Sequence, residues 1–111
     1  MSFKLLLKGM GVSVGQAEGK VCVIQSAGDF QKLQDGDILV AHNTDPSMTF
    51  IINKTAGIVC DVGGMTSHPA IISRELGIPA VVGTGSATKI LHDGMQIMID
   101  GASGEIFQKT N

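Results

Sequence analysis

The sequence predicts an α/β fold with a parallel central sheet and an antiparallel outer sheet. In the middle of the chain, segments typical of strands and helices alternate as strand, helix, strand, helix, strand. This order is typical of βαβ units, whose strands lie parallel and are joined by right-handed crossovers. Both ends of the chain are instead rich in β-type residues with short glycine-containing turns, which indicates hairpins of antiparallel strands.

The predicted strands are six short runs rich in valine and isoleucine. They span residues 20–24, 37–40, 57–60, 80–82, 96–99 and 105–107. Asp93-Gly94 and the glycine-bounded segment 101–104 predict turns on either side of the fifth run. No repeat, low-complexity stretch or linker divides the chain, so we expect a single domain over residues 1–111.

Proline and the residues around it predict two helices. Asp45 followed by Pro46 is typical of an N-cap and a first helical residue, and the apolar spacing that follows predicts a helix over residues 46–54. Pro69 suits the first position of a second helix in the same way. We expect this helix over residues 69–76, because a glycine follows it directly.

The composition excludes several classes of partner. With a formal net charge of -2, no run of lysine or arginine and an aromatic fraction of 4%, the chain lacks the features that bind nucleic acid or an anionic membrane surface. No apolar run is long enough to cross a membrane, and the first residues lack the apolar core of a secretory signal. We therefore expect a cytoplasmic protein that binds neither nucleic acid nor a membrane.

A candidate anion site lies between the third predicted strand and the second predicted helix, in residues 63–69 (GGMTSHP). Ligands of open α/β sheets bind at the carboxyl ends of parallel strands, where this loop is expected. Gly63 and Gly64 permit positive φ angles and close approach of the backbone. The helix that follows offers N–H groups without intrahelical partners and the positive end of its dipole, which together suit a phosphate group.

His68 distinguishes this loop from an ordinary phosphate loop. A helix N-terminus disfavours imidazolium, so we expect a neutral imidazole with a nucleophilic lone pair. Thr66 and Ser67 add hydroxyl donors, and Arg74 adds a forked cation, for a phosphoryl group carried on the imidazole. A histidine in this position can also do no more than cap a helix or bind a backbone group, and both interpretations stay open on these residues alone.

Other chemically active side chains show no pattern that predicts a site. His42 follows a strand and is expected to be an exposed loop residue, with the alternative that it borders the site. His92 precedes a turn, and the three histidines lack the spacing of metal ligands, so we expect no metal site. Cys22 and Cys60 lie inside apolar runs without CxxC spacing, which predicts buried free thiols.

The segment GGMTSH (63–68) and its continuation AIISRELGIPAVVGT (70–84) resemble the phosphohistidine swivelling, or mobile, domain of phosphoenolpyruvate-utilising enzymes. That family includes phosphoenolpyruvate synthase, pyruvate phosphate dikinase, enzyme I of the bacterial sugar phosphotransferase system and rifampicin phosphotransferase. The resemblance extends over residues 11–21, 44–46 and 93–101, and so over nearly the whole chain. It implies a three-layer β/β/α swivelling fold.

The resemblance also implies roles for individual residues. In that family the histidine matching His68 carries the phosphoryl group on Nε2, and the arginine matching Arg74 lies near that group. The threonine matching Thr66 lies beside the histidine and, in plant dikinases, is itself a regulatory phosphorylation site. The chain departs from the family at Pro69 and Ser73, where alanine is common. Pro69 is compatible with a first helical position, so the site is expected to be intact.

The function implied is that of a phosphoryl carrier, which accepts the group on His68 and delivers it to a second site by swivelling. The implied partners are an ATP-grasp or other nucleotide-binding domain or subunit and a domain or subunit that binds phosphoenolpyruvate, pyruvate or another acceptor. We expect Mg²⁺ and ATP or phosphoenolpyruvate at those partner sites, no cofactor bound by this chain alone, and no phosphotransferase activity without partners. The alternative is a non-catalytic interaction or regulatory module that retains the fold; the presence of Thr66 and Arg74 beside the histidine favours the carrier.

Overall fold

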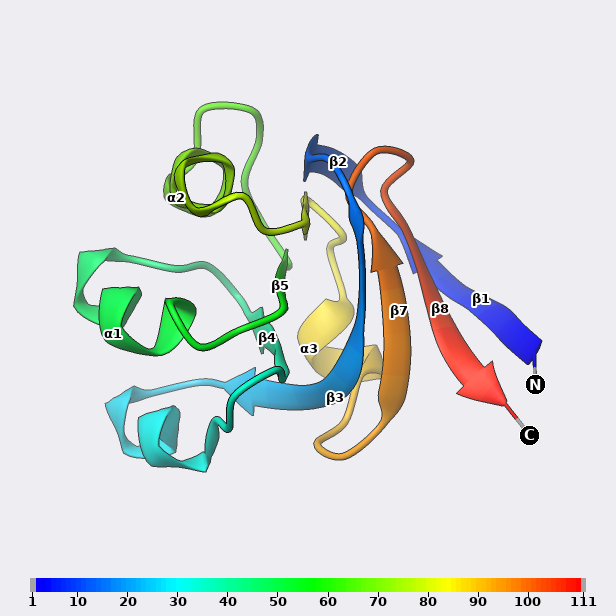
Figure 1. Ribbon diagram of the computed structural model, residues 1–111, viewed down its shortest axis with the longest axis horizontal. Helices are drawn as coiled ribbons and strands as arrows, with labels where there is room; N and C mark the ends of the chain where they lie inside the picture. The colour runs from blue at the N-terminus through cyan, green and yellow to red at the C-terminus, as the bar shows by residue number, and fades with distance from the viewer. Residues whose placement is uncertain (1, 111) are drawn as a thin grey trace.

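The protein's computed structural model describes residues 2–110, within which eight strands form one mixed sheet. The strands are β1 (Ser2–Lys8), β2 (Met10–Ser13), β3 (Gln16–Ile24), β4 (Ile38–Ala41), β5 (Gly57–Cys60), β6 (Ala80–Val82), β7 (Gln96–Asp100) and β8 (Glu105–Thr110). They lie in the order β1-β8-β7-β3-β4-β5-β6-β2 (Figure 1). β3 to β6 run parallel, whereas β1, β8, β7 and β3 pair antiparallel, as β2 and β6 do. The predicted parallel centre with an antiparallel outer part is confirmed.

One strand, β3, joins the two parts of the sheet. Its residues 16–20 pair antiparallel with β7, and its residues 21–24 pair parallel with β4. The valine- and isoleucine-rich run at 20–24 predicted only the second half, because the first half is polar and contains a glycine. Gly19 is required there, since a Cβ atom at this position would lie 2.5 Å from the carbonyl oxygen of Gly36.

The helices are short. They are the 3₁₀ helices η1 (Ala27–Lys32) and η2 (Pro46–Met48) and the α-helices α1 (Thr49–Ile52), α2 (His68–Leu76) and α3 (Ala87–Ile90). The helix predicted over residues 46–54 is a 3₁₀ turn followed by one α-helical turn, capped as expected by the Asp45 side chain. α2 begins one residue earlier than predicted and ends as predicted before Gly77, which adopts a left-handed φ of 72°.

Four elements were missed by the sequence patterns: β1, β2, η1 and α3. β1 consists mainly of leucine and lysine, which favour helices at least as much as strands. β2 is four residues long and contains a glycine. η1 and α3 span six and four residues, which is too short for a helical hydrophobic period to be recognised.

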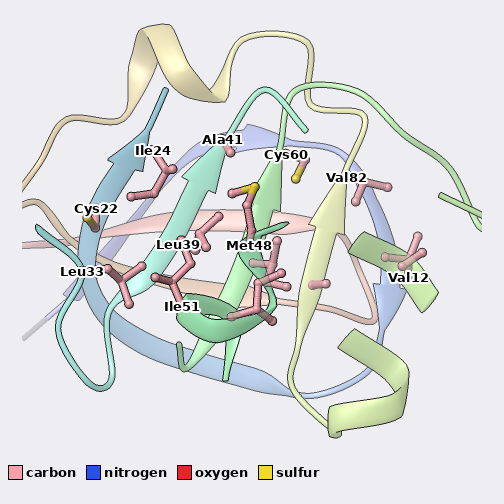
Figure 2. Packing of buried hydrophobic residues seen from close by; sticks show 14 residues of the cluster. Val12, Cys22, Ile24, Leu33, Leu39, Ala41, Met48, Ile51, Cys60 and Val82 are labelled. Carbon is pink, nitrogen blue, oxygen red and sulfur yellow. The ribbon is translucent and has the colours of Figure 1, made fainter. Parts of the chain in front are cut away.

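Two buried apolar clusters fill the two faces of the parallel strands and separate three layers. One cluster lies between these strands and the layer of α1, α2 and η1 (Figure 2). The other lies between the parallel strands and the antiparallel strands, where α3 also packs. Because successive side chains of a strand point to opposite faces, Leu39 belongs to the first cluster and Ile38 and Val40 to the second. The three-layer β/β/α fold is confirmed, and Figure 1 shows α1 and α2 on one side of β4 and β5, with β7 and β8 on the other.

The sheet curls so that the consecutive strands β1 and β2 lie at its two opposite ends. The chain crosses between them at Gly9, whose N–H donates to the carbonyl of Gly104 at 2.8 Å. A Cβ atom at Gly9 would lie 2.5 Å from the carbonyl oxygen of Val82. At Gly101 a Cβ atom would overlap the carbonyl oxygen of Ser13. The turn between β7 and β8 is therefore packed backbone to backbone against β1 and β2.

The predicted state of both cysteines is confirmed. Cys22 and Cys60 are free and buried, and burial raises the pKa of the Cys60 thiol to about 12. In the part of the chain that the structure describes, no helix has the length and apolar character needed to cross a membrane.

Candidate functional site

The site is built where β4 and β5 end side by side. Their parallel pairing continues one step beyond the strands, because the N–H of Asp61 donates to Ala41 at 3.1 Å and the N–H of Val62 to His42 at 3.1 Å. Only then do the two loops diverge, one toward η2 and the other toward α2. This register brings the residues that follow β4 next to those that precede α2.

His68 is the first residue of α2 and is half-buried. Its Nδ1 lies 2.7 Å from Oγ1 of Thr44, a residue only 4% exposed in the loop after β4. Within residues 2–110, no hydrogen bond is formed by Nε2 of the same ring. Thr44 therefore occupies one ring nitrogen and leaves the other without a protein partner there.

Thr44 was missed as a site residue by the sequence analysis, which included it only in a segment, residues 44–46, that resembles the family. The available signal was a hydroxyl residue directly before the Asp45-Pro46 helix start, at the carboxyl end of the strand next to the histidine loop. That signal is weak without the order of the strands, because only their adjacency brings Thr44 and His68 together across 24 positions.

The two glycines of the loop have different surroundings. Gly63 has a φ of +116°, and a Cβ atom on it would lie 2.9 Å from the Ser67 hydroxyl oxygen. Gly64 has no positive φ, and a Cβ atom on it would meet nothing within 4 Å. Close approach of a ligand to the backbone of these glycines stays a prediction, whereas the positive φ that both permit is adopted by Gly63 and not by Gly64. The reason is that Gly64 opens an ordinary turn, closed by the N–H of Ser67 at 3.1 Å, which suits any residue.

The hydroxyl groups of the loop also differ. Ser67 is the N-cap residue of α2, and its hydroxyl donates to the Gly64 carbonyl at 2.8 Å, so its proton is used inside the loop. Thr66 is exposed and forms no hydrogen bond within residues 2–110. Its hydroxyl is therefore free to donate, and its contact with a phosphoryl group stays a prediction. Direct contact of Ser67 with a phosphate stays a prediction.

Arg74 connects the loop to the sheet. Its Nη2 donates to the carbonyl of Met65 at 2.6 Å, and its Nη1 donates to the carbonyl of Val12 in β2 at 3.0 Å. The guanidinium thus lies against the loop, with these two donors directed at backbone oxygens. Its predicted contact with a phosphoryl group remains a prediction.

Asp61 anchors the start of the same loop. Its carboxylate is 7% exposed and accepts hydrogen bonds from the Thr88 N–H at 2.9 Å, the Thr88 hydroxyl at 2.6 Å and Nδ1 of His42 at 3.4 Å. Burial raises the pKa of Asp61, but these hydrogen bonds outweigh it and hold the pKa below its usual value. The His42 side chain is 75% exposed, so the expected exposed loop histidine is confirmed.

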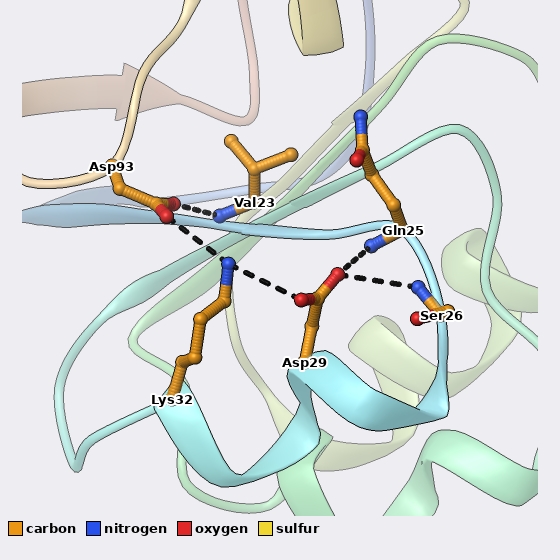
Figure 3. A network of polar contacts seen from close by, with 6 residues as sticks. All are labelled: Val23, Gln25, Ser26, Asp29, Lys32 and Asp93. Carbon is orange, nitrogen blue, oxygen red and sulfur yellow. Dashed lines mark hydrogen bonds and ion pairs between the residues drawn. The ribbon is translucent and has the colours of Figure 1, made fainter.

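A second group of charges joins η1 to the turn before β7 (Figure 3). Lys32 lies 3.4 Å from Asp29 and 3.0 Å from Asp93, and Asp93 also accepts from the N–H of Val23 at 2.7 Å. The hydrogen bond from the Val23 N–H lowers the pKa of Asp93 most, and the contact with Lys32 lowers it further. None of the predicted site residues belongs to this network. Across residues 2–110, no three His, Cys, Asp or Glu side chains are grouped closely enough to hold a metal ion.

Comparison with known proteins identifies the family. Residues 33–104, which include the whole histidine loop, match the family model described as the mobile domain of PEP-utilising enzymes. The chain belongs to this family. The mobile domain is 53% identical to a probable phosphoenolpyruvate synthase of Archaeoglobus fulgidus over 105 residues, and 49% identical to the phosphoenolpyruvate synthase of Pyrococcus furiosus over 105 residues. It aligns over 95% of its own length with both but covers only 14% and 13% of theirs.

Solved structures agree with this assignment. The structure of enzyme I (nEIt) superimposes with a TM-score of 0.63 at 34% identity, covering 74% of the mobile domain and 34% of that chain. Aconitase X of Thermococcus kodakaraensis superimposes with a TM-score of 0.64 at 24% identity, over 94% of the mobile domain and 98% of that chain. The second likeness concerns the fold alone.

Proposed function

We propose that this mobile domain is a phosphoryl carrier in which Nε2 of His68 accepts a phosphoryl group from one site and passes it to another. The observation that carries the proposal is the 2.7 Å hydrogen bond between Nδ1 of His68 and the Thr44 hydroxyl. When Nδ1–H donates to this buried oxygen, the neutral imidazole has its lone pair on Nε2. The nitrogen without a protein partner is then the nucleophile.

The transfer is a displacement at phosphorus. The Nε2 lone pair forms the new N–P bond, and the bond between phosphorus and the oxygen of the donor breaks, with the electron pair leaving on that oxygen. The Nδ1 proton stays between the ring and Thr44, so the phosphorylated imidazole keeps its orientation. In the second half-reaction an acceptor oxygen attacks phosphorus, and the N–P electron pair returns to Nε2.

The histidine loop supplies groups that suit the charge of the phosphohistidine. The start of α2 contributes the positive end of its dipole and N–H groups without intrahelical acceptors. Gly63 and Gly64 keep the backbone accessible, and the free hydroxyl of Thr66 is available as a donor. Because Thr66 is exposed, it is also open to regulatory phosphorylation, which would place a second dianion beside His68 and oppose transfer.

The donor and acceptor sites belong to partner domains or subunits in this proposal. The phosphoenolpyruvate synthases that match this domain are six to eight times longer, since it covers 13–16% of the first three. An ATP-grasp or other nucleotide-binding partner would donate, and a partner that binds phosphoenolpyruvate, pyruvate or another acceptor would receive. Mg²⁺ with ATP, or phosphoenolpyruvate, is expected at those partners, where metal and cations can be positioned for transfer.

Phosphoramidate, a small donor that phosphorylates histidine without a partner protein, tests the proposal. We expect His68 to become phosphorylated, with a phosphate that is labile in acid and stable in base. The His42→Ala variant should take up phosphate at His68 as the wild type does. His42 is the matched control because it lies at the same edge of the sheet but is exposed and paired with Asp61. Phosphate uptake at the normal rate by His68→Ala, or label that survives acid, would exclude the carrier function. The alternative, a non-catalytic interaction or regulatory module, would then remain.

Nitrogen-15 NMR of the imidazole, before and after phosphorylation, tests the role of Thr44. We expect phosphorus on Nε2, and a loss of roughly 10² in the phosphorylation rate of Thr44→Val, because the ring loses the group that fixes its tautomer and orientation. Thr44→Ser retains a hydroxyl and should retain most of the rate. Phosphorus on Nδ1, or an unchanged rate in Thr44→Val, would contradict the assigned geometry.

A further inference from the structure

The contacts of Arg74 concern the backbone of the histidine loop. One guanidinium group binds two carbonyl oxygens from different parts of the chain, Met65 in the loop at 2.6 Å and Val12 in β2 at 3.0 Å. Hydrogen bonds from a charged donor are about twice as strong as those between neutral groups. The Met65 carbonyl is therefore held toward α2 by one of the strongest contacts of the loop.

The orientation of this carbonyl fixes the orientation of an N–H group. The peptide bonds of residues 2–110 are all trans, and in a planar trans peptide the C=O and N–H bonds point in opposite directions. Since the Met65 carbonyl faces Arg74, the N–H of Thr66 in the same peptide faces away from it. The preceding peptide is held in a similar way, because the Gly64 carbonyl accepts from both the N–H and the hydroxyl of Ser67.

The backbone N–H groups of residues 63–66 are without a partner in the part of the chain that the structure describes. Within residues 2–110, none of the N–H groups of Gly63, Gly64, Met65 and Thr66 donates to a backbone carbonyl or a side chain. Thr66 is also an exposed residue. Successive outward N–H groups beside a helix N-terminus are typical of backbone sites that bind phosphate.

We propose that Arg74 is a positioning residue, which orients the Met65–Thr66 peptide so that the Thr66 N–H donates to the phosphoryl group on His68. This inference rests on the proposed function and gives Arg74 a role through the backbone instead of direct contact. The forked guanidinium suits that role because its two terminal nitrogens bridge two carbonyls. A lysine ammonium at the same place is a single point charge without the fork.

The ¹H–¹⁵N spectrum of the Thr66 amide, recorded before and after phosphorylation with phosphoramidate, tests the inference. In the wild type we expect the Thr66 amide proton to move downfield when His68 is phosphorylated. In Arg74→Gln this chemical-shift displacement should be lost. Phosphorylation should slow roughly tenfold to a hundredfold, because a misplaced Thr66 N–H no longer stabilises the transition state. Arg74→Lys should restore part of both. Lys89→Gln, which removes an exposed cation from α3, is the control and should change neither.

The outcomes separate this inference from the proposed function. Wild-type protein that takes up no phosphate at His68 refutes the carrier and this inference with it. Phosphorylated wild type whose Thr66 amide does not move, or Arg74→Gln that retains the full displacement, refutes the positioning role alone. If only the positioning role is refuted, a shift of the Arg74 guanidinium signals on phosphorylation would indicate direct contact with the phosphoryl group. Because the amide shift is read on folded protein, lower stability of Arg74→Gln cannot imitate a positive result, and Arg74→Lys gives a second variant if Arg74→Gln does not fold.

Discussion

Glycines occur in the histidine loop and in the turn between β7 and β8, and their surroundings differ. In the turn, Gly101 and Gly104 lie against the backbone of Ser13 and Gly9, where there is no room for a side chain. In the loop, Gly64 faces open space, and only Gly63 has a positive φ and a close neighbour. The glycines of the turn thus close the sheet, whereas Gly64 leaves the surface of the loop open.

The backbone N–H groups of the two regions differ in the same way. In and around the turn they have acceptors: Gly101 donates to Gly15 at 2.8 Å, Gly104 to Asp100 at 2.9 Å and Ala102 to the Asp100 side chain at 2.9 Å. In the histidine loop, the N–H groups of residues 63–66 have none within residues 2–110. Since backbone donors are nearly always satisfied in folded proteins, by protein or by solvent or ligand, the loop has retained the capacity to bind an anion. The turn thus contributes to the stability of the fold, whereas the loop holds the groups on which the proposed phosphoryl transfer depends.

The largest effect is expected from Gly101→Ala. A methyl group there would overlap the Ser13 carbonyl, so β7–β8 and β1–β2 would have to separate, and we expect a loss of roughly 3 kcal/mol or more in the free energy of unfolding. Urea denaturation measures it. Gly28→Ala is the control, because Gly28 has no positive φ and its nearest neighbour would be 3.7 Å from the new Cβ. Equal stability of the two variants would contradict the backbone packing described for the turn.

A smaller effect should separate the two glycines of the loop. Gly63→Ala combines a positive φ with a 2.9 Å contact to Ser67 and should cost about 1–3 kcal/mol. Gly64→Ala should change stability by no more than about 0.5 kcal/mol. Phosphorylation of His68 by phosphoramidate should be slower in Gly64→Ala than in the wild type, because the new methyl group enters the open side of the loop. Loss of stability in Gly64→Ala with normal phosphorylation would show that the loop depends on glycine in the same way as the turn.

The smallest effect concerns the acid stability of the two regions. The pKa of Asp61 is lowered in the folded protein, so this carboxylate stabilises the fold above its unfolded pKa, near 3.8, and that stabilisation is lost as the pH falls through the lower folded value. Asp61→Asn should therefore flatten the decrease of the urea midpoint between about pH 5 and pH 2. Asp100→Asn, at the end of β7 next to the turn, is the comparison. The pKa of Asp100 is lowered chiefly by the N–H groups of Ser103 and Ala102.

Asp61 and Asp100 should not respond equally. Asp61 is 7% exposed and bound by three donors, whereas the carboxylate of Asp100 is exposed to solvent, which screens its contacts. We expect the slope of the urea midpoint against pH to change more in Asp61→Asn than in Asp100→Asn. A larger change in Asp100→Asn would place the acid-sensitive contact in the turn instead of the loop.

The sequence by itself determined the parts that depend on neighbouring residues. The runs at 57–60 and 80–82 gave strands with the predicted ends because they are continuous, buried and rich in β-branched residues. The end of α2, and its start to within one residue, followed from glycine and proline, whose backbone preferences act locally. The order GG, hydroxyls, histidine, helix was enough to locate the candidate anion site for the same reason.

Only the tertiary structure decided which distant groups meet in that site. Thr44 binds His68 because β4 and β5 are neighbours in a fixed register, and Arg74 binds Val12, 62 positions away, because the sheet curls and brings β2 beside α2. The difference between Gly63 and Gly64 likewise depends on where Ser67 lies in space. Such contacts are set by the packing of side chains and strands that are far apart in the sequence, and a local pattern of residues contains no information about those distances.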